Sequence, residues 1–286
     1  MKKTVGKLLI IAGILILAGL MFNGGRHIFF GKNQETVRSA SASPKKINHI
    51  DIDSKSITVK IKAENRDDID AELSGGNARL ESSEQGDTLR LSVEQQGFRL
   101  FFFKKNELTV HIPYEYQDNL SITSGSGNVK ILGEHLSLQK VSLSSGSGSQ
   151  KVDHLQADEL SVRGTSGNIR LEHVETAEAD IRSTSGNTEL EDVTGKLTIK
   201  HTSGNLEASF STVNAPLRIS QTSGNVRLEL PDNADISLQA TLTSGNISHS
   251  YPFDQTEGDK RTLIGKNGDG KNKIDISSTS GNVSID

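Results

Sequence analysis

The sequence has 286 residues and no cysteine, which excludes disulfides, zinc–thiolate sites and thiol nucleophiles. Trp is absent and aromatic residues make up 4%, whereas there are 27 Gly, so we expect many turns and no aromatic-rich binding surface. The formal net charge is −4. Without Lys2, Lys3 and Lys7, which precede the first acidic residue, 29 basic residues face 36 acidic ones, or about −7. This acidic remainder makes nucleic acid an unexpected partner.

The first element in the chain is an uninterrupted apolar run from Leu8 to Phe22, preceded by three lysines. A helix rises about 1.5 Å per residue, so the run must extend from Gly6 to Gly25 to reach the roughly 30 Å of a hydrocarbon core. No Ala-x-Ala cleavage site follows directly, which favours an uncleaved anchor, although a cleaved signal stays open. We predict a short cytoplasmic tail and transmembrane anchor over 1–25 and a spacer over 26–45. Everything after the anchor is expected outside the cell, because the lysines precede the run.

Residues 46–118 are rich in strand patterns but lack an obvious repeat. Alternating apolar and polar residues occur at 57–61, 89–93 and 108–112. We predict a β-rich cap here that shields the end of the following repeats. Within it, Ser74-Gly75-Gly76-Asn77 is interpreted as a degenerate early repeat.

From residue 119 onward the chain repeats the tripeptide Ser-Gly-Asn at intervals of 18 to 21 residues, with a last interval of 36. Ser precedes the Gly in all eight copies, Asn follows it in seven (Ser149 is the exception), and Thr stands two positions before it in six. The flanks alternate apolar and polar residues, as at Leu160 and Val162 before Gly167, which marks strands with one buried face. Each repeat is therefore predicted to be a strand, a corner, a second strand and a return loop.

Such units bury their apolar side only by stacking on one another. The pattern predicts an all-β fold, a right-handed parallel β-solenoid of about eight rungs over 119–286, with rungs about 4.8 Å apart. We interpret the corner residues as structural, because Gly supplies unusual backbone angles and Asn tolerates the left-handed region and can bond along the stack. Binding of ions or sugars is the alternative. The predicted structural corner residues are Gly127, Gly148, Gly167, Gly186, Gly204, Gly224, Gly245 and Gly281, with Asn128, Asn168, Asn187, Asn205, Asn225, Asn246 and Asn282.

The 36-residue interval before the last repeat contains Asn-Gly and Asp-Gly pairs between strand patterns, so we predict a hairpin insertion near 259–273. The chain then ends at Val283–Asp286, directly after the last corner. We expect this last strand to leave the C-terminal solenoid edge open, where a partner or a second copy can add a strand.

The apolar N-terminal run, the segment Phe101–Pro113 (FFFKKNELTVHIP) and the Thr-Ser-Gly-Asn rungs together resemble the LiaG-like group of "putative adhesin" proteins, over the whole chain. The resemblance implies a β-strand repeat protein of a Gram-positive membrane, associated with the Lia response to envelope stress from wall-active antibiotics. It supplies no catalytic residue, cofactor or metal ligand.

The repeat register also aligns charged side chains. Arg163, Arg182 and Lys200 fall four positions before the Gly on successive rungs, and the acidic column at 153, 172 and 191 falls five positions after it. A solvated face is one interpretation, and an anionic ligand on the basic stripe is the other. One position beyond the acidic column, His154, His173 and Asp192 share a column that could bind a divalent metal. We assign no catalytic, cofactor-binding or metal-binding residue.

The sequence predicts a non-enzymatic scaffold or interaction protein of the cell envelope, without a cofactor. It is expected to be a single-pass protein of the cell membrane with its N-terminus in the cytoplasm. Its expected partners are the membrane, through the N-terminal helix, and an unidentified envelope protein or glycan. Adhesion or glycan binding is the alternative function, and a degenerate polysaccharide-active enzyme is a third.

Overall fold

The computed structural model describes residues 39–286, except 77 and 96–105. The predicted anchor over 1–25 and most of the predicted spacer lie outside these residues. Within the described part the sole helix is the single turn η1 (Pro44–Lys46), so none of the described helices could cross a bilayer. Residues 37–286 form one compact unit.

Nineteen strands make up the described unit, so the all-β prediction is confirmed. In chain order they are β1 (Ser39–Ala42), β2 (His49–Ser54), β3 (Thr58–Glu64), β4 (Ile69–Ser74), β5 (Ala78–Gln85), β6 (Thr88–Gln95), β7 (Glu107–Pro113), β8 (Asn119–Ser124), β9 (Val129–Ser145), β10 (Gln150–Ser166), β11 (Ile169–Ser185), β12 (Thr188–Ser203), β13 (Leu206–Ser209), β14 (Leu217–Ser223), β15 (Val226–Glu229), β16 (Ile236–His249), β17 (Gln255–Gly258), β18 (Thr262–Asn267) and β19 (Asn272–Ile285).

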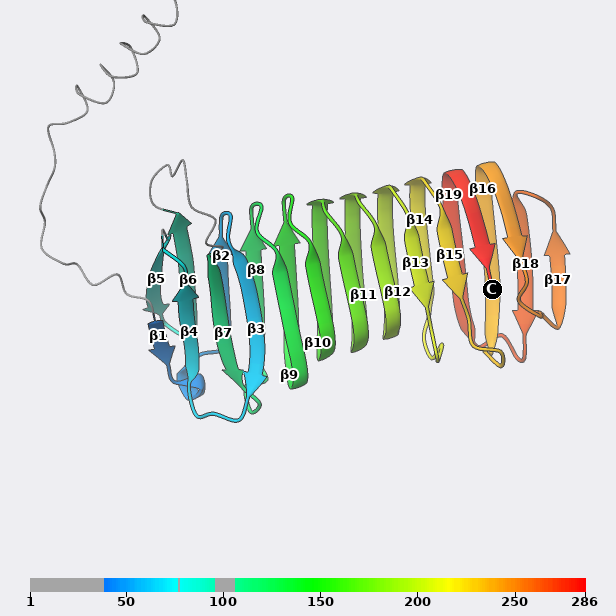
Figure 1. The fold of residues 1–286 in the computed structure, drawn as a ribbon. Helices are drawn as coiled ribbons and strands as arrows, with labels where there is room; N and C mark the ends of the chain where they lie inside the picture. Colours follow the sequence, from blue (N-terminus) through cyan, green and yellow to red (C-terminus); the bar gives the residue numbers. More distant parts are fainter. Residues whose placement is uncertain (1–38, 77, 96–105) are drawn as a thin grey trace, which may run out of the picture. The chain divides into compact units, whose positions relative to one another are not determined.

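The strands stack side by side in parallel rungs, as Figure 1 shows. We call the strand segments that lead into the Ser-Gly-Asn corners the approach face, and the segments that leave the corners the return face. On the approach face Leu160 of β10 pairs with Ala179 of β11, and on the return face Val152 pairs with Leu171. Equivalent residues of consecutive repeats are therefore neighbours, as the solenoid prediction requires. The handedness of the coil stays a prediction.

Alternation along each strand places one set of side chains between the two faces. In β10, Leu160 and Val162 are buried, whereas Arg163 next to them is exposed. The same pattern in every rung produces one continuous hydrophobic core that runs through the stack. Burial of this shared core holds the rungs together, because a single rung has too little apolar surface of its own.

The last rung in sequence is not the last rung in space, so the expected open edge at the C-terminus is wrong. Val283 of β19 pairs with Val226 of β15 on one side and with Ile247 of β16 on the other. In Figure 1 the C-terminus accordingly lies within the row of strands, with β18 and β17 beyond it. Strand β16 does not pair directly with β14 or β15. Strand β19 lies between them instead, so both of its edges are paired.

The N-terminal end is built in the same way. The first rung in sequence, β2 and β3, lies between β6–β7 on one side and β8–β9 on the other. It belongs to the solenoid stack although it falls in the predicted cap and has no Ser-Gly-Asn. The predicted degenerate repeat at 74–77 is wrong, because the flanking strands β4 and β5 run antiparallel to β7 and β6, whereas the repeats of the solenoid pair in parallel. Within the described residues Ser54–Ile57 forms a further corner, because Ser54 pairs with Ser124 and a Cβ on Gly127 would come within 1.8 Å of the carbonyl oxygen of Ile57.

Antiparallel strands cover both ends of the stack. At the N-terminal end β5 pairs with β6, β4 pairs with β7, and β1 pairs with β4. Strand β1 and the 5%-exposed Ala42 lie in the predicted spacer, whose last residues are thus part of the fold. At the other end β18 pairs with β16, and β17 pairs with β18.

The insertion before the last repeat differs in detail from the expected hairpin. The antiparallel turn lies at Asp259–Arg261, between β17 and β18. The Asn-Gly-Asp-Gly loop after Lys266 instead crosses the end of β16, because β18 and β19 pair with opposite edges of that strand. Asp235 accepts hydrogen bonds from the backbone N–H groups of Gly270 and Lys271 and fixes this crossing.

Candidate functional site

The eight corners, seven with Ser-Gly-Asn and one with Ser147-Gly148-Ser149, stack directly on one another along one side of the solenoid. A Cβ added to Gly281 would come within 1.7 Å of the carbonyl oxygen of Gly224, and one added to Gly245 would come equally close to that of Gly281. The order of the corner glycines in space is Gly127, Gly148, Gly167, Gly186, Gly204, Gly224, Gly281, Gly245. From Gly167 onward these glycines also have positive φ, between 113° and 143°. Only Gly fits here, because the backbones approach too closely for any side chain.

The corner asparagines form a hydrogen-bond ladder rather than left-handed turns. Among the described residues, positive φ outside Gly occurs only at a different bend, so the left-handed part of the Asn interpretation is wrong. The carbonyl oxygen of the Asn168 side chain accepts the backbone N–H of Asn187 at 3.0 Å, and that of Asn187 accepts the N–H of Asn205 at 3.3 Å. Asn225 bonds in both directions, to Asn205 and to Asn282. These bonds tie each corner to the next.

Buried polar side chains support some corners from inside. Nε2 of His201 donates to the carbonyl oxygen of Gly186 at 3.0 Å, and one rung further Gln221 donates to that of Gly204 at 3.0 Å. Burial lowers the pKa of His201, and its contacts with Gly186 and Gln221 oppose this only in part. His201 is therefore held neutral beneath the corner.

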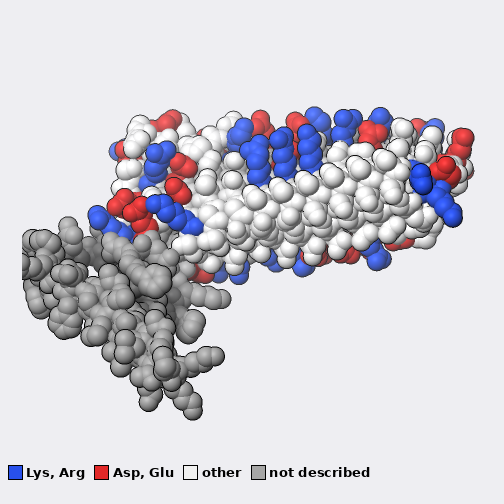
Figure 2. All heavy atoms as spheres, turned by 90° about the horizontal axis from the view of Figure 1, so that it is seen from above, with Lys and Arg blue, Asp and Glu red and all other residues white. Residues whose placement is uncertain are grey.

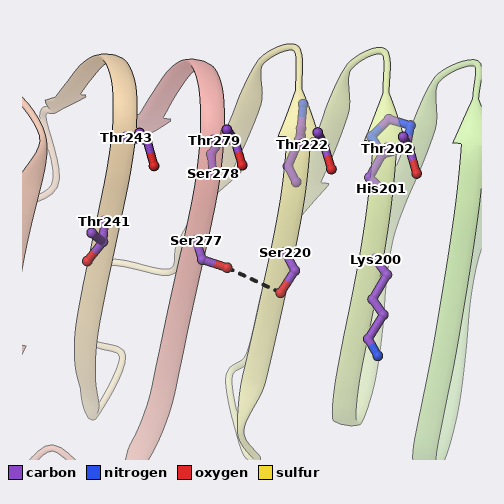
Figure 3. Close-up of a pocket in the computed structure, with 11 residues that line it drawn as sticks. Lys200, His201, Thr202, Ser220, Thr222, Thr241, Thr243, Ser277, Ser278 and Thr279 are labelled. Atoms are coloured by element: carbon purple, nitrogen blue, oxygen red, sulfur yellow. Dashed lines mark hydrogen bonds between the residues drawn. The ribbon is translucent and has the colours of Figure 1, made fainter.

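The outer side of the approach face carries a shallow groove below four corners (Figure 3). Next to the corners lies a row of exposed threonines, in the spatial order Thr202, Thr222, Thr279, Thr243. The second row, in the same order, is Lys200, Ser220, Ser277 and Thr241. The Ser277 hydroxyl lies 3.2 Å from that of Ser220 and links two rungs. Sequence spacing could not have found this groove, because it depends on the last repeat lying between the two before it.

The charge columns are brought together as the repeat register predicts, but opposite charges interleave with them. Arg182 pairs with Arg163 on one neighbouring strand and with Lys200 on the other. Asp180 lies 2.8 Å from Arg182 and 4.0 Å from Arg163, whereas Lys200 makes no ion pair within the described part of the chain. Figure 2 looks down on the corners and shows a broad strip without charged side chains, with rows of Lys and Arg beside it.

The acidic column is neutralised in a similar way. Asp153, Glu172 and Glu191 lie on neighbouring strands, as expected. Lys151 is 2.5 Å from Glu172, and Arg170 hydrogen-bonds the same carboxylate. The pKa of Glu172 is lowered, since these cations outweigh the opposing effect of its burial, which is the largest single influence. Like charges stacked along the solenoid are thus separated by counter-ions in the adjacent column.

The histidine column also forms, with one change of membership. The rings of His154 and His173 stack with centroids 4.5 Å apart, and Asp153 rather than Asp192 completes the cluster. Asp192 instead accepts the backbone N–H of Ser211 at 2.7 Å, and hydrogen bonding to the side chain and then the backbone of Ser211 lowers the pKa of Asp192. His135 belongs to the same bend but was missed, because its rung is longer and shifts it out of the column.

No curated protein matches the chain. Among solved structures, a protein from Parabacteroides distasonis described as a "putative adhesin" is similar at 15% identity, with a TM-score of 0.47 and coverage of 87% of this chain and 96% of that one. A "putative adhesin" from Bacteroides fragilis gives 14% identity and 0.46, with the same coverage. A "putative cell adhesion protein" from Clostridium sporogenes gives 13% and 0.31, covering 87% and 98%.

A family model also matches most of the chain. This model, described as Toastrack DUF4097, matches residues 47–286. The match begins just before β2 and includes both the irregular N-terminal strands and every Ser-Gly-Asn rung. The chain belongs to the Toastrack DUF4097 family.

Proposed function

We propose that this protein is a non-enzymatic interaction scaffold of the bacterial cell envelope. It is held in the membrane by residues 1–25 and displays the corner side of its solenoid outside the cell. The observation that carries the proposal is the uncharged strip along the corners, a repeating surface fixed rung by rung by the Gly contacts and the Asn ladder. Such a surface suits an extended partner better than a small substrate, because it offers many equivalent weak contacts.

The membrane anchor is supported by the lysines that precede the apolar run from Leu8 to Phe22. Membership of the LiaG-like group, and with it a part in the Lia envelope-stress response, belongs to the same proposal and is supported by the resemblance of the motifs. Protease added to intact protoplasts should digest the solenoid domain from outside. Protection of that domain until the membrane is broken would overturn the orientation.

The partner can be sought by crosslinking in living cells. A photo-crosslinking residue at Thr222, in the corner-side groove, should capture an envelope component under wall-antibiotic stress. The matched control carries the same residue at Glu207, which is exposed on the return face. Equal capture from both positions, or capture from neither, would count against a binding role of the corner side.

Glycan binding is the second candidate, and the two hydroxyl rows of the groove favour it. Thr222, Thr279 and Ser277 present hydroxyls on adjacent rungs about 4.8 Å apart, and hydroxyl arrays of this kind can hydrogen-bond successive sugar hydroxyls. Thr222→Val with Thr279→Val removes two hydroxyls but keeps β-branched side chains. This variant should bind purified wall glycan at least tenfold more weakly, whereas Thr165→Val, in the same column outside the groove, should bind normally. Unchanged glycan binding by the double variant would exclude the groove as the glycan-binding site.

A further inference from the structure

The bend at His154, His173 and Asp192, six positions after the corner Gly, holds a side-chain cluster that the proposed function does not use. We propose that Asp153, His154 and His173 bind one divalent transition-metal ion of the zinc, nickel or copper class. Imidazole nitrogens with one carboxylate oxygen are a donor set that these ions take in proteins.

The donor atoms already converge. Nδ1 of His154 lies 2.7 Å and Nδ1 of His173 lies 3.7 Å from the same oxygen, Oδ1 of Asp153. One ligand atom from each of the three residues lies within 4.8 Å of the others. In a tetrahedral zinc site with bonds of about 2.0–2.1 Å, neighbouring donors stand about 3.4 Å apart. The observed separations lie on both sides of this value, so small side-chain rotations complete the site.

Those rotations are available at the surface. The two imidazoles stack with an interplanar angle of 19° and must tilt to aim both nitrogens at one ion. Their side chains are 56% and 46% exposed, so nothing buried has to move. Lys151 approaches the other oxygen of Asp153, Oδ2, at 3.8 Å and leaves Oδ1 to the metal.

The backbone holds the histidines where ligands are needed. His154 and His173 both have left-handed backbone angles, with φ of 55° and 51°, and the strands on either side of the bend pair in register. Asp192 makes the same bend on the next rung with φ of 51°, so the bend itself does not require an imidazole. Asn or Asp would serve the backbone equally well. The imidazoles add two nitrogen donors beside a carboxylate.

The cluster opens onto a hollow of about 450 Å³, which His135, Glu134 and Glu175 also line. Solvent therefore reaches the remaining coordination positions, and a fourth protein ligand is not needed.

The test is calorimetric titration of ZnCl2 into the full-length protein in detergent, without a polyhistidine tag, at pH 7.5. We expect one ion per chain. His154→Asn and His173→Asn keep a residue that tolerates the bend, and each should weaken binding at least tenfold, as should Asp153→Asn. His249→Asn, at an exposed histidine outside the cluster, should leave the affinity unchanged, and Asp192→Asn, which removes a nearby charge but no ligand, should weaken binding much less than tenfold. Cu²⁺ bound in place of zinc should show nitrogen hyperfine coupling by electron paramagnetic resonance, which His173→Asn reduces.

Failure of the wild-type protein to bind one Zn²⁺ more tightly than the double variant His154→Asn/His173→Asn would overturn the proposal. So would an equal loss in Asp192→Asn, since that residue lies outside the ligand set. Far-UV circular dichroism of every variant should match wild type, and any variant that fails this is replaced by His154→Gln or His173→Gln.

Discussion

Gly281 lies directly on the carbonyl oxygen of Gly224, although 57 residues separate them and Gly245 falls between them in sequence. A Cβ at Gly281 would come within 1.7 Å of that oxygen. The contact fixes the last repeat of the chain inside the stack, between β15 and β16.

Replacing Gly281 with Ala is therefore expected to destabilise the fold strongly. The substitution combines a left-handed φ of 129° with a backbone clash, and we expect a loss of about 2–4 kcal/mol in the free energy of unfolding. Urea denaturation measures it. Gly86→Ala is the matched control, because Gly86 also has positive φ but a Cβ there meets nothing within 4 Å, so we expect about 1 kcal/mol. Similar losses for both variants would show that the stacking contact contributes little.

Deleting residues 272–286, which removes β19, should damage the solenoid from within rather than shorten it. Strand β16 loses its parallel neighbour, and β14 and β15 each lose one of their two parallel neighbours. Hydrogen exchange should show lost protection in β14–β18 and retained protection in β9–β11. If β19 were a terminal strand, as its place in sequence suggests, protection in β16 and β18 would survive the deletion.

The Asn ladder should make position 225 more sensitive than position 246. The Asn225 side chain donates to Asn205 and accepts from the backbone N–H and side chain of Asn282, whereas Asn246 donates only to the adjacent Ile247 carbonyl. At about 0.5–1.5 kcal/mol for each net hydrogen bond, Asn225→Ala, which loses three, should cost about 1.5–4.5 kcal/mol, and Asn246→Ala, which loses one, about 0.5–1.5 kcal/mol. Thermal unfolding of both variants beside wild type gives the comparison. Equal melting temperatures for the two would contradict a ladder.

The folded protein should become less stable on acidification because of His201. Burial lowers the pKa of this side chain in the folded protein below the ordinary 6.5, so on acidification the unfolded chain takes up its proton first. The stability that His201 contributes is present above pH 6.5 and is lost as pH falls toward and through the folded pKa. His201→Gln should remove this dependence, because Gln221 makes the equivalent bond one rung away at 3.0 Å. Urea denaturation from pH 7.5 to 5.0 measures the free energy of unfolding at each pH. If it changed with pH equally in wild type and variant, His201 would be excluded as the cause.

The repeat could be read from the sequence because its signals are local. Alternation at Leu160 and Val162 assigns one strand face to the core, and the close approach at each corner demands Gly whatever lies elsewhere in the chain. For the same reason Arg163 and Arg182 were placed side by side correctly. Ser54–Ile57 was missed as a corner because Ile57 and Thr58 stand where the other corners have Gly-Asn, and only its position beside Gly125 and Gly127 shows its role.

The order of the rungs is a different kind of property. Strands β14, β16 and β19 have the same alternation and the same corner, so local patterns cannot say which of them are neighbours. The sequence by itself determined the strand, the corner and the inward-facing residues of each repeat, since backbone sterics and burial act within one rung. Tertiary structure alone decided that the first and last rungs lie inside the stack. The rung order depends on which strand edges are covered by the antiparallel strands at the two ends. These contacts join segments that lie far apart in the chain, so no local pattern can encode them.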